Sequence, residues 1–556
     1  MKEKKAIKES ESASISTQAT PSGKATDVGD LKIKKGYNTW KLVIFGLAFM
    51  APALSLMATF PLVLVAGFTW MGIPLAYLIA GVSAIITAVA FSQLVRAYPK
   101  SGSVWAFAQG AVGAKFGQFA VWIYLLEILV VPAAALIPAG FFLESWLGVP
   151  PWVTIIVFVA VVSLLAISGT RTSVGSMAVL FLIQVGILIA FAVSAIMWSI
   201  NTGNFATMAI QAVTPNASLF GIAGITAGAT VAIFSFLGYE APASVAGEAE
   251  NPKRNVYWGI IGSALIATAL YFFLAWGFVL GVPSKGLHTL LWYVNPVPAM
   301  GDAIWGPGLG NILNFAGVIA GLVAALAGVT ASSRVLQKLG EDDIIPKAFA
   351  KVDLKVAAPV VSISMVAIIT LVLGNFAPWE VIAYTIAAGA LPAFIITNLL
   401  SFWHYRRELI NPKRFVLNGI LPWLGVILCS WFILVGIPAH LKWILVMWVL
   451  VGVILVFINA VARPKAFGEE RKGVPIGAVI GLIVSIILLI FVVLSFGLWL
   501  GFYSSGIEWW HIIAPYALND MVAIAATIGM VVIFAVLMGA VLFRSKIGGR
   551  SGETKS

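Results

Sequence analysis

The sequence predicts an all-α protein that crosses a lipid bilayer many times, and three observations lead to this prediction. Hydrophobic residues make up 61% of the 556 residues, charged residues only 10%, and the mean hydropathy is +1.01. Soluble domains carry about 25% charged residues, so lipid rather than water must cover most of this surface. The chain also holds 53 glycines and 20 tryptophans. Glycine lets membrane helices approach closely and tryptophan favours the headgroup region, as a polytopic membrane protein requires.

Apolar stretches long enough to cross the bilayer recur along the whole chain. A hydrocarbon core of about 30 Å needs about 20 apolar residues in helical form. Fourteen spans are predicted, near 41–66, 72–95, 116–144, 151–169, 174–199, 219–246, 254–280, 309–335, 358–376, 379–404, 415–437, 440–462, 474–501 and 521–544.

Basic residues predict the orientation of these spans. With both termini on the cytoplasmic side, only Lys285 and Lys442 of the 34 Lys and Arg residues fall in outward loops. Cytoplasmic loops of membrane proteins are enriched in Lys and Arg, and one span more or fewer would invert every later loop. The net charge of +12 is then explained by topology and anionic lipid, without nucleic-acid binding. We expect a multi-pass protein of the cell membrane.

The remaining composition argues against several other classes of protein. Residues 1–36 are polar and lack the apolar region of a signal peptide, so we expect a disordered cytoplasmic tail there, and we expect 547–556 to be a cytoplasmic tail. The lone Cys429 excludes a disulfide within the chain and a thiolate metal cluster. Phosphate-binding loops, metal-ligand motifs and nucleophile elbows are absent from the sequence. We expect neither an enzyme nor a bound metal or cofactor.

Two spans contain helix-breaking residues at matching positions, each in the first helix of a five-helix block. Pro52 lies in the first span, whereas the sixth contains Gly238, Glu240 and Pro242. Proline removes a backbone donor and clashes with the preceding turn, so the first span should unwind near residues 49–55. Irregular backbone at membrane depth is tolerated where it packs in protein or lines a cavity. Such paired breaks are typical of transporters that bind their substrate near the membrane midplane.

The sixth span carries the most specific motif of the sequence. The stretch 234–255, FSFLGYEAPASVAGEAENPKRN, closely resembles the signature of the amino acid–polyamine–organocation superfamily. The loop 98–105, YPKSGSVW, and the segment 331–346 after the eighth span are similar to two further motifs of that family. The resemblance covers about residues 38–462.

The resemblance implies the leucine-transporter fold, an inverted repeat of two five-helix blocks with alternating access around a midplane site. The expected units are 37–200 (first repeat), 201–408 (second repeat), 409–463 (helices 11 and 12) and 464–546 (extra helices 13 and 14). The sequence predicts no role for the two extra helices.

The resemblance also implies where the substrate binds. In this family, backbone groups of helices 1 and 6 hold the carboxylate and the amine of the substrate. By position these residues are Pro52, Ala53, Leu54, Ser55, Phe234, Ser235, Phe236 and Leu237. Phe234 matches an aromatic gate over the substrate. The chain departs from the usual Gly-Ser-Gly of helix 1, which leaves less room for a carboxylate. It also has Gln184 where some members carry a lysine that replaces sodium.

Acidic and hydroxyl side chains at membrane depth are the candidates for ion coupling. A buried acid costs about 2.5–3.5 kcal/mol even on lenient insertion scales, so Glu127 and Glu240 are candidate proton carriers. Glu127 lies in a stretch similar to that of the putrescine-importer branch, and is also a candidate counter-charge for a cationic substrate. Thr330, Ser332 and Ser333 form a possible cation site. The structural alternatives are protonated, hydrogen-bonded acids and hydroxyls bonded to their own helix.

These observations together predict a secondary active transporter that imports amino acids, coupled to protons, with sodium as the less favoured ion. The alternatives are a carrier of putrescine or other polyamines and an amino acid exchanger. A channel would differ by uncoupled flux, and a membrane-bound sensor would bind its ligand without moving it. The partners expected are a small-molecule substrate, an ion and lipid. The sequence does not indicate an oligomeric state.

Overall fold

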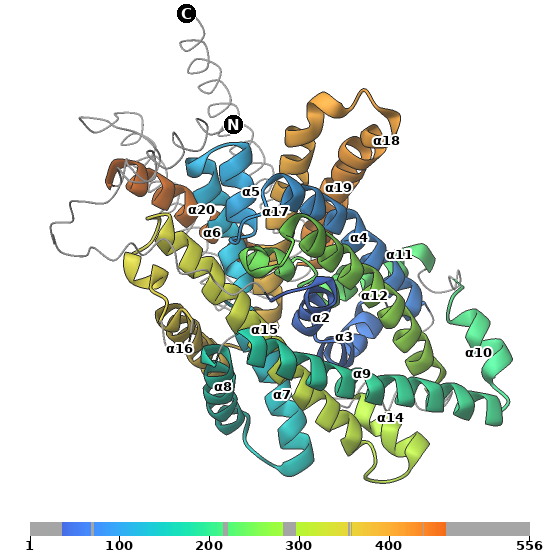
Figure 1. The fold of residues 1–556 in the computed structure, drawn as a ribbon. Coiled ribbons are helices and arrows are strands. Elements are labelled where there is room, and N and C mark those ends of the chain that lie inside the picture. The colour runs from blue at the N-terminus through green and yellow to red at the C-terminus, as the bar shows by residue number, and fades with distance from the viewer. Residues whose placement is uncertain are drawn as a thin grey trace, which may run out of the picture. The chain divides into compact units, whose positions relative to one another are not determined.

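The computed structural model describes residues 36–67, 72–168, 170–214, 221–281, 296–353, 356, 358–437 and 439–462. Most of these residues are in helices (Figure 1), and within these ranges the backbone forms isolated β-bridges but no β-strand. The prediction of an all-α protein is confirmed. Nearly all of segment 1–36, and the whole of 464–546 and 547–556, lie outside the described residues.

The helices follow one another closely along the chain. The earlier ones are α2 (Thr39–Met50), α3 (Pro52–Gly67), α4 (Ile73–Ala97), α5 (Val104–Ala111), α6 (Ala114–Ile128), α7 (Val131–Leu147), α8 (Pro151–Ile167), α9 (Thr170–Asn201), α10 (Phe205–Gln211) and α11 (Gly221–Ala232). The later ones are α12 (Pro252–Leu280), α14 (Pro296–Trp305), α15 (Asn311–Glu341), α16 (Val360–Phe376), α17 (Trp379–Tyr405), α18 (Pro412–Phe415), α19 (Leu421–Gly436) and α20 (Ala439–Ala462). Short 3-10 or π-helical segments are η2 (Ile233–Phe236), η3 (Ala241–Glu248), η4 (Lys347–Ala350), η5 (Arg406–Glu408) and η6 (Val416–Ile420).

Nine helical stretches in the described part of the chain are long and apolar enough to cross a membrane. Three shorter apolar helices coincide with further predicted spans, namely Pro151–Ile167, Val360–Phe376 and Ile444–Ala460. The protein is therefore polytopic. The total of fourteen spans and the inverted repeat stay predictions, because spans 474–501 and 521–544 lie outside the described residues.

Small residues let the central helices approach one another closely. Helix α12 lies against α4, α2 and α9, and α15 lies against α7 and α9. A Cβ atom on Gly81 of α4 would meet the side chain of Thr268 on α12. One on Gly259 of α12 would meet Leu42 of α2 at 2.7 Å. Glycine at these crossings lets the backbone of one helix pack against a side chain of the next, and small residues of this kind are common where membrane helices pack.

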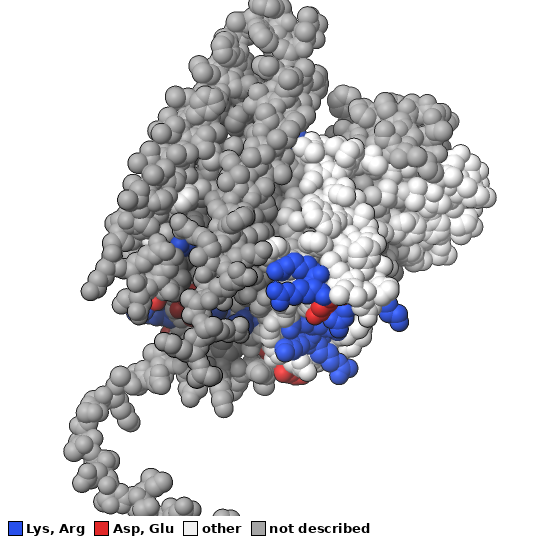
Figure 2. Space-filling model, turned by 90° about the horizontal axis from the view of Figure 1, so that it is seen from above, with Lys and Arg blue, Asp and Glu red and all other residues white. Residues whose placement is uncertain are grey.

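Basic side chains gather on part of the surface seen in Figure 2, beside a broad area without charge. The basic residues of segment 406–414 lie together on η5 and α18. Lys442, predicted in an outward loop, is buried at the start of α20, where its ammonium group donates to the Leu434 carbonyl at 2.8 Å. Lys285 lies outside the described residues. The orientation of the termini stays a prediction.

The first span is interrupted at a single residue. Helix α2 ends at Met50 and α3 begins at Pro52, and between them Ala51 has left-handed backbone (φ 46°, ψ 69°). The N–H of Ser55 already donates to the Ala51 carbonyl at 2.8 Å. The predicted unwinding over 49–55 was too wide, because proline fits the first turn of a helix, where no N–H is needed.

The sixth span is interrupted over a longer stretch. Helix α11 tightens into η2, Leu237 is extended, and Gly238 has a φ of +123° before the chain resumes a helical path at Ala241. The carboxylate of Glu240 turns back and accepts a hydrogen bond from the Gly238 N–H at 3.0 Å. The break predicted in this span is present, and an acidic side chain is attached to it.

A third interruption, which the sequence analysis did not predict, divides the span 116–144 between α6 and α7. Pro132 has no N–H to donate to the carbonyl of Ile128, four residues earlier. The hydroxyl group of Ser332 on α15 donates to that carbonyl instead. Glu127 lies in the last turn of α6, which ends at Ile128, so the second candidate acid also lies beside a helix break.

The segment before α2 is fastened to the end of η3. The N–H groups of Gly36 and Tyr37 donate to the Glu248 carbonyl at 3.0 and 3.3 Å, and the Glu250 N–H donates to the Tyr37 carbonyl at 3.1 Å. The Glu248 carboxylate forms a buried ion pair with Arg334 of α15, with 2.6 Å between Oε1 and Nε. Burial, and to a lesser extent the negative charge of Glu248, raise the pKa of the Tyr37 hydroxyl group. We call Tyr37, Glu248 and Arg334 the Glu248 clasp.

Candidate substrate-binding site

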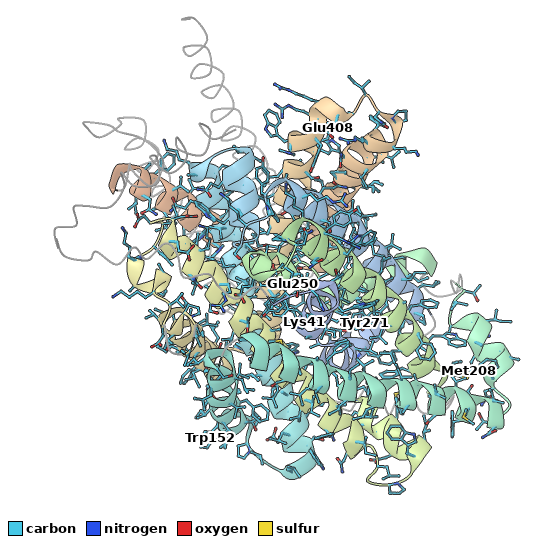
Figure 3. All side chains as sticks on the ribbon, in the orientation of Figure 1. Lys41, Trp152, Met208, Glu250, Tyr271 and Glu408 are labelled. Atoms are coloured by element: carbon cyan, nitrogen blue, oxygen red, sulfur yellow. The ribbon has the colours of Figure 1, made fainter. Side chains whose placement is uncertain are left out.

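The first and sixth spans touch each other at their breaks. Gly238 lies so close to α2 that a Cβ atom would meet the ring of Phe49 and stand 3.2 Å from the Met50 nitrogen. Tyr271 of α12, which Figure 3 places among the central helices, donates from its hydroxyl group to the Met50 carbonyl at 3.2 Å. Only glycine adopts a φ of +123° without strain and also leaves room for this close approach. The contact between the two breaks therefore depends on glycine at position 238.

We expect Gly238→Ala to destabilise the protein by about 1–3 kcal/mol, because an L-residue is strained at this backbone conformation. The added Cβ would also displace Phe49. The apparent melting temperature of the purified protein in detergent measures the effect. Gly186→Ala is the matched control, since its Cβ would meet open space on α9 and should be neutral or slightly stabilising. Equal melting temperatures for the two variants would contradict the proposed close contact.

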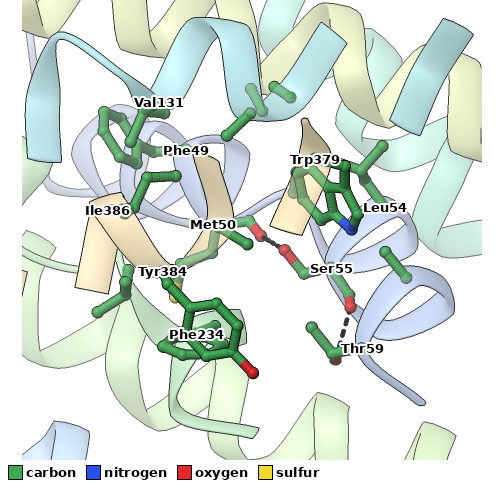
Figure 4. Close-up of a pocket in the computed structure, with 17 residues that line it drawn as sticks. Phe49, Met50, Leu54, Ser55, Thr59, Val131, Phe234, Trp379, Tyr384 and Ile386 are labelled. Carbon is green, nitrogen blue, oxygen red and sulfur yellow. Dashed lines mark hydrogen bonds between the residues drawn. The ribbon is translucent and has the colours of Figure 1, made fainter. Parts of the chain in front are cut away.

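A cavity of about 230 Å³ lies beside the two breaks (Figure 4). The broken spans contribute Phe49, Met50, Ala51, Leu54, Ser55, Ala58, Thr59, Phe234 and Leu237. Helices α7, α15 and α17 contribute Val131, Ala134, Ala135, Ala324, Trp379, Ala383, Tyr384 and Ile386. None of these seventeen lining residues is acidic or basic. The cavity therefore offers polar atoms only at the backbone and at a few hydroxyl and indole groups.

Hydroxyl groups on one side of the cavity form a connected network. The Ser55 hydroxyl donates to the Met50 carbonyl at 2.5 Å, and the Thr59 hydroxyl donates to the Ser55 carbonyl at 2.7 Å, as the dashed lines in Figure 4 mark. The Thr59 oxygen also lies 2.5 Å from the Tyr77 hydroxyl and 2.9 Å from that of Ser235. This network ties α3 to α4 and η2, and it fixes the polar wall of the cavity.

Half of the residues predicted to hold the substrate line the cavity. Those on its wall are Leu54, Ser55, Phe234 and Leu237, and those outside its lining are Pro52, Ala53, Ser235 and Phe236. The ring of Phe234 meets that of Tyr384 edge-on, with 5.6 Å between centroids. Phe236 packs in the same manner against Tyr271, at 5.0 Å. A binding role for the eight residues stays a prediction.

Gln184 lies directly at the first break. Its fully buried side chain accepts a hydrogen bond from the Ala53 N–H at 3.3 Å. This N–H belongs to the first turn of α3, whose amides have no partner within the helix. The following residue, Leu54, lies on the cavity wall. Gln184 thus satisfies one backbone donor of the first turn of α3. Its amide group does not titrate, so it does not carry a transported proton.

Glu127 and Glu240 are brought together by the fold. Both side chains are fully buried, and their carboxyl groups interact with each other. Neither oxygen of Glu127 has a hydrogen-bond partner among the described residues. Tyr124 and Tyr239 interact electrostatically with both acids. In the described part of the chain, no Lys, Arg or His forms an ion pair with either carboxylate, and neither acid lines the cavity.

The three hydroxyl residues predicted as a possible cation site all bond to backbone carbonyls. Thr330 donates to the Leu326 carbonyl at 2.7 Å and Ser333 to the Thr330 carbonyl at 3.0 Å, both within α15. Ser332 donates to Ile128, where it satisfies the carbonyl left free by the proline kink. Each hydroxyl therefore has a structural partner, and a cation site here stays a prediction.

Much of the cavity wall was missed by sequence reasoning. Trp379 and Tyr384 of α17 and the alanines of α7 and α15 belong to no motif, because the facing of their helices is decided by packing alone. Thr59 had a usable signal. It lies four residues after Ser55 on the same helix, and residues at that spacing share a helix face.

Comparisons with known proteins show which family the chain belongs to. Residues 45–378, more than half of the chain, match the family described as amino acid permease. The branched-chain amino acid permease BcaP of Lactococcus lactis is 29% identical over 439 residues, covering 74% of this chain and 90% of that protein. The low-affinity putrescine importer PlaP of Escherichia coli is 27% identical over 389 residues, covering 67% and 82%. The gamma-aminobutyric acid permease of Bacillus subtilis is 27% identical over 348 residues, covering 59% and 71%.

The family match, the similarity to transporters of amino acids and of putrescine, and the apolar helices lead to one conclusion. This chain belongs to the amino acid permease family of the amino acid–polyamine–organocation superfamily, and it is a multi-pass membrane transporter of amino acids or amines rather than an enzyme.

Proposed function

We propose that this transporter imports amino acids across the cell membrane by alternating access, driven by the proton gradient. The observation that carries the proposal is the contact of the two helix breaks at Gly238 and Met50 beside the cavity. Broken helices present backbone donors and acceptors at membrane depth. An amino acid carries both a carboxylate and an ammonium group, and it complements such a pair of helix ends.

The two ends of the substrate suit different helix ends. Leu54 and Ser55, in the first turn of α3, line the cavity, and a helix N-terminus attracts a carboxylate. The carbonyl groups at the end of η2 have the opposite polarity and suit an ammonium group. Phe234, on η2, lies against Tyr384 and would cover the bound substrate. This arrangement follows the inverted-repeat organisation that the sequence predicts.

Proton coupling is assigned to the pair formed by Glu127 and Glu240. Two adjacent carboxylates in an apolar interior repel each other, and a proton shared between them removes this repulsion. The Glu240 carboxylate also accepts a hydrogen bond from Gly238, the residue that joins the two breaks. Gain or loss of the proton would therefore act directly on the backbone at the break. Sodium bound by the hydroxyl groups of α15 is the less favoured alternative.

The main rival function is import of putrescine, and its support is the similarity to PlaP. A dication would need a carboxylate in contact with it, and Glu127 is the candidate. Exchange of amino acids without an ion is a second alternative within the same family. All three functions use the same cavity, and transport measurements separate them.

The test is uptake into proteoliposomes of labelled neutral amino acids, basic amino acids and putrescine under an inward proton gradient. We expect an amino acid to accumulate above its external concentration and the accumulation to collapse with a protonophore. Accumulation that follows an inward sodium gradient instead would replace the proton by sodium. Uptake only against preloaded amino acid would indicate exchange. Flux that is linear with concentration and shows no counterflow would indicate a channel.

A further inference from the structure

We infer that the cavity selects α-amino acids with large, uncharged, apolar side chains, and that α7, α15 and α17 supply the wall that selects them. This inference rests on the proposed function, since it concerns the substrate of the same cavity. The wall opposite the helix breaks consists of alanines and larger apolar residues, among them Ala134, Ala324, Ala383 and Ile386. The carboxylate and ammonium groups of the substrate would bind at the helix breaks, and its side chain would face this wall.

The absence of charge along the cavity excludes cationic side chains on energetic grounds. None of the described lining residues is acidic. The acids Glu127 and Glu240 are fully buried, interact electrostatically with one another and lie outside the lining. A second ammonium group, as in lysine or a diamine, would therefore be buried without a counter-charge, which is far more costly than leaving it in water.

Aromatic rings on the wall do not reverse this argument. A ring face attracts an ammonium group, and Phe234, Tyr384 and Trp379 all line the cavity. However, Phe234 and Tyr384 are already engaged edge-to-face with one another at 84°. A cation–π contact also compensates only part of the loss of water around a charge. The rings are better suited to cover an apolar side chain.

The size of the cavity favours a large side chain over a small one. The free space is about 230 Å³, and the alanines of α7 and α15 keep the wall free of bulk. Each additional carbon buried against this wall adds to the binding free energy. We expect leucine or isoleucine to bind roughly 50-fold better than alanine, because three more carbons are buried.

The first experiment measures competition against uptake of labelled isoleucine by the full-length wild-type protein in proteoliposomes. Unlabelled leucine should compete roughly 50-fold better than alanine, whereas lysine and putrescine should be weaker than leucine by at least about 100-fold. Accumulation of lysine or putrescine but not isoleucine would overturn the inference and leave amino acid or amine transport intact. Isoleucine bound by the detergent-purified protein but not transported would uphold the inference and sink the proposed function. Absence of both binding and uptake of isoleucine would overturn the inference.

A charge placed on the wall tests the same inference from the opposite side. Ala383 is half-buried on α17 and faces the cavity, so a longer side chain there would enter the free space. Ala383→Glu should weaken the binding of isoleucine. It should strengthen competition by lysine by about tenfold or more, since the lysine ammonium group gains a partner. Ala383→Gln is the matched control, of nearly equal size but without charge. It should weaken the binding of isoleucine without strengthening competition by lysine. Equal lysine competition in both variants would show that this wall does not face the substrate side chain.

Discussion

Replacing Glu127 by glutamine will abolish accumulation of substrate driven by a proton gradient, while exchange of substrate across the membrane persists. Glutamine preserves the size of the side chain but cannot release a proton to the pair with Glu240. A coupling free energy between proton and substrate of about 1–3 kcal/mol corresponds to an affinity change of about 5- to 150-fold with pH, and this change should vanish. Uptake under a proton gradient and counterflow at equal pH, both in proteoliposomes, measure the two effects. Glu240→Gln should behave alike.

Glu144→Gln provides the matched control for these variants. Glu144 is an exposed acid on α7, so the same substitution there removes a charge without touching the pair. Its uptake and pH profile should equal those of the wild type. If Glu127→Gln leaves uptake, its pH dependence and the substrate preference unchanged, Glu127 does not carry the transported proton and is a structural acid.

Breaking the Glu248 clasp will produce the largest loss of stability among single substitutions of charged residues. Arg334→Ala leaves the Glu248 carboxylate buried without its partner, and removal of one member of a buried ion pair costs about 3–5 kcal/mol. The side chains of Arg334 and Glu248 are only 9% and 2% exposed, so water cannot replace the lost contact. The apparent melting temperature in detergent should fall markedly, and uptake should fall with it.

Two further variants separate loss of the pair from loss of either side chain. Arg334→Met combined with Glu248→Met removes both charges and should recover much of the stability, because no unpaired charge remains. Lys347→Ala breaks an exposed pair with Asp343, whose side chains are 78% and 51% exposed, and should cost no more than about 1 kcal/mol. An Arg334→Ala variant as stable as Lys347→Ala would mean that the clasp does not stabilise the fold.

The class of the fold was predictable from the sequence. The low content of charged residues indicates a surface covered by lipid, and the long apolar stretches mark the helices. The break at Pro52 was also predictable, since proline acts on its own helix. Its extent was not. Ala51 alone leaves the helical conformation because Pro52 can begin the next helix, and only the backbone path shows this. The kink between α6 and α7 was missed although Pro132 stands in the sequence, because proline kinks depend on what satisfies the freed carbonyl.

The candidate site was predictable only where a residue acts through its own backbone. Leu54, Ser55, Phe234 and Leu237 follow from the position of the breaks, and they line the cavity. Contacts between distant helices could not be derived in this way. The approach of Glu127 to Glu240 brings together two spans that are far apart in the sequence, so it depends on tertiary packing. The apolar wall on α17, with Trp379, depends on the rotation of one long helix about its axis.

The contact at Gly238 has a mechanical consequence for transport. Phe49 and Met50 occupy the space that a side chain at 238 would need, and Tyr271 holds the Met50 carbonyl from a third helix. Neither break can straighten by itself without colliding with the other. Packed elements of this kind change between discrete arrangements and do not deform continuously. The breaks in the first and sixth spans should therefore change conformation together, so that states in which only one of them has moved are scarcely populated.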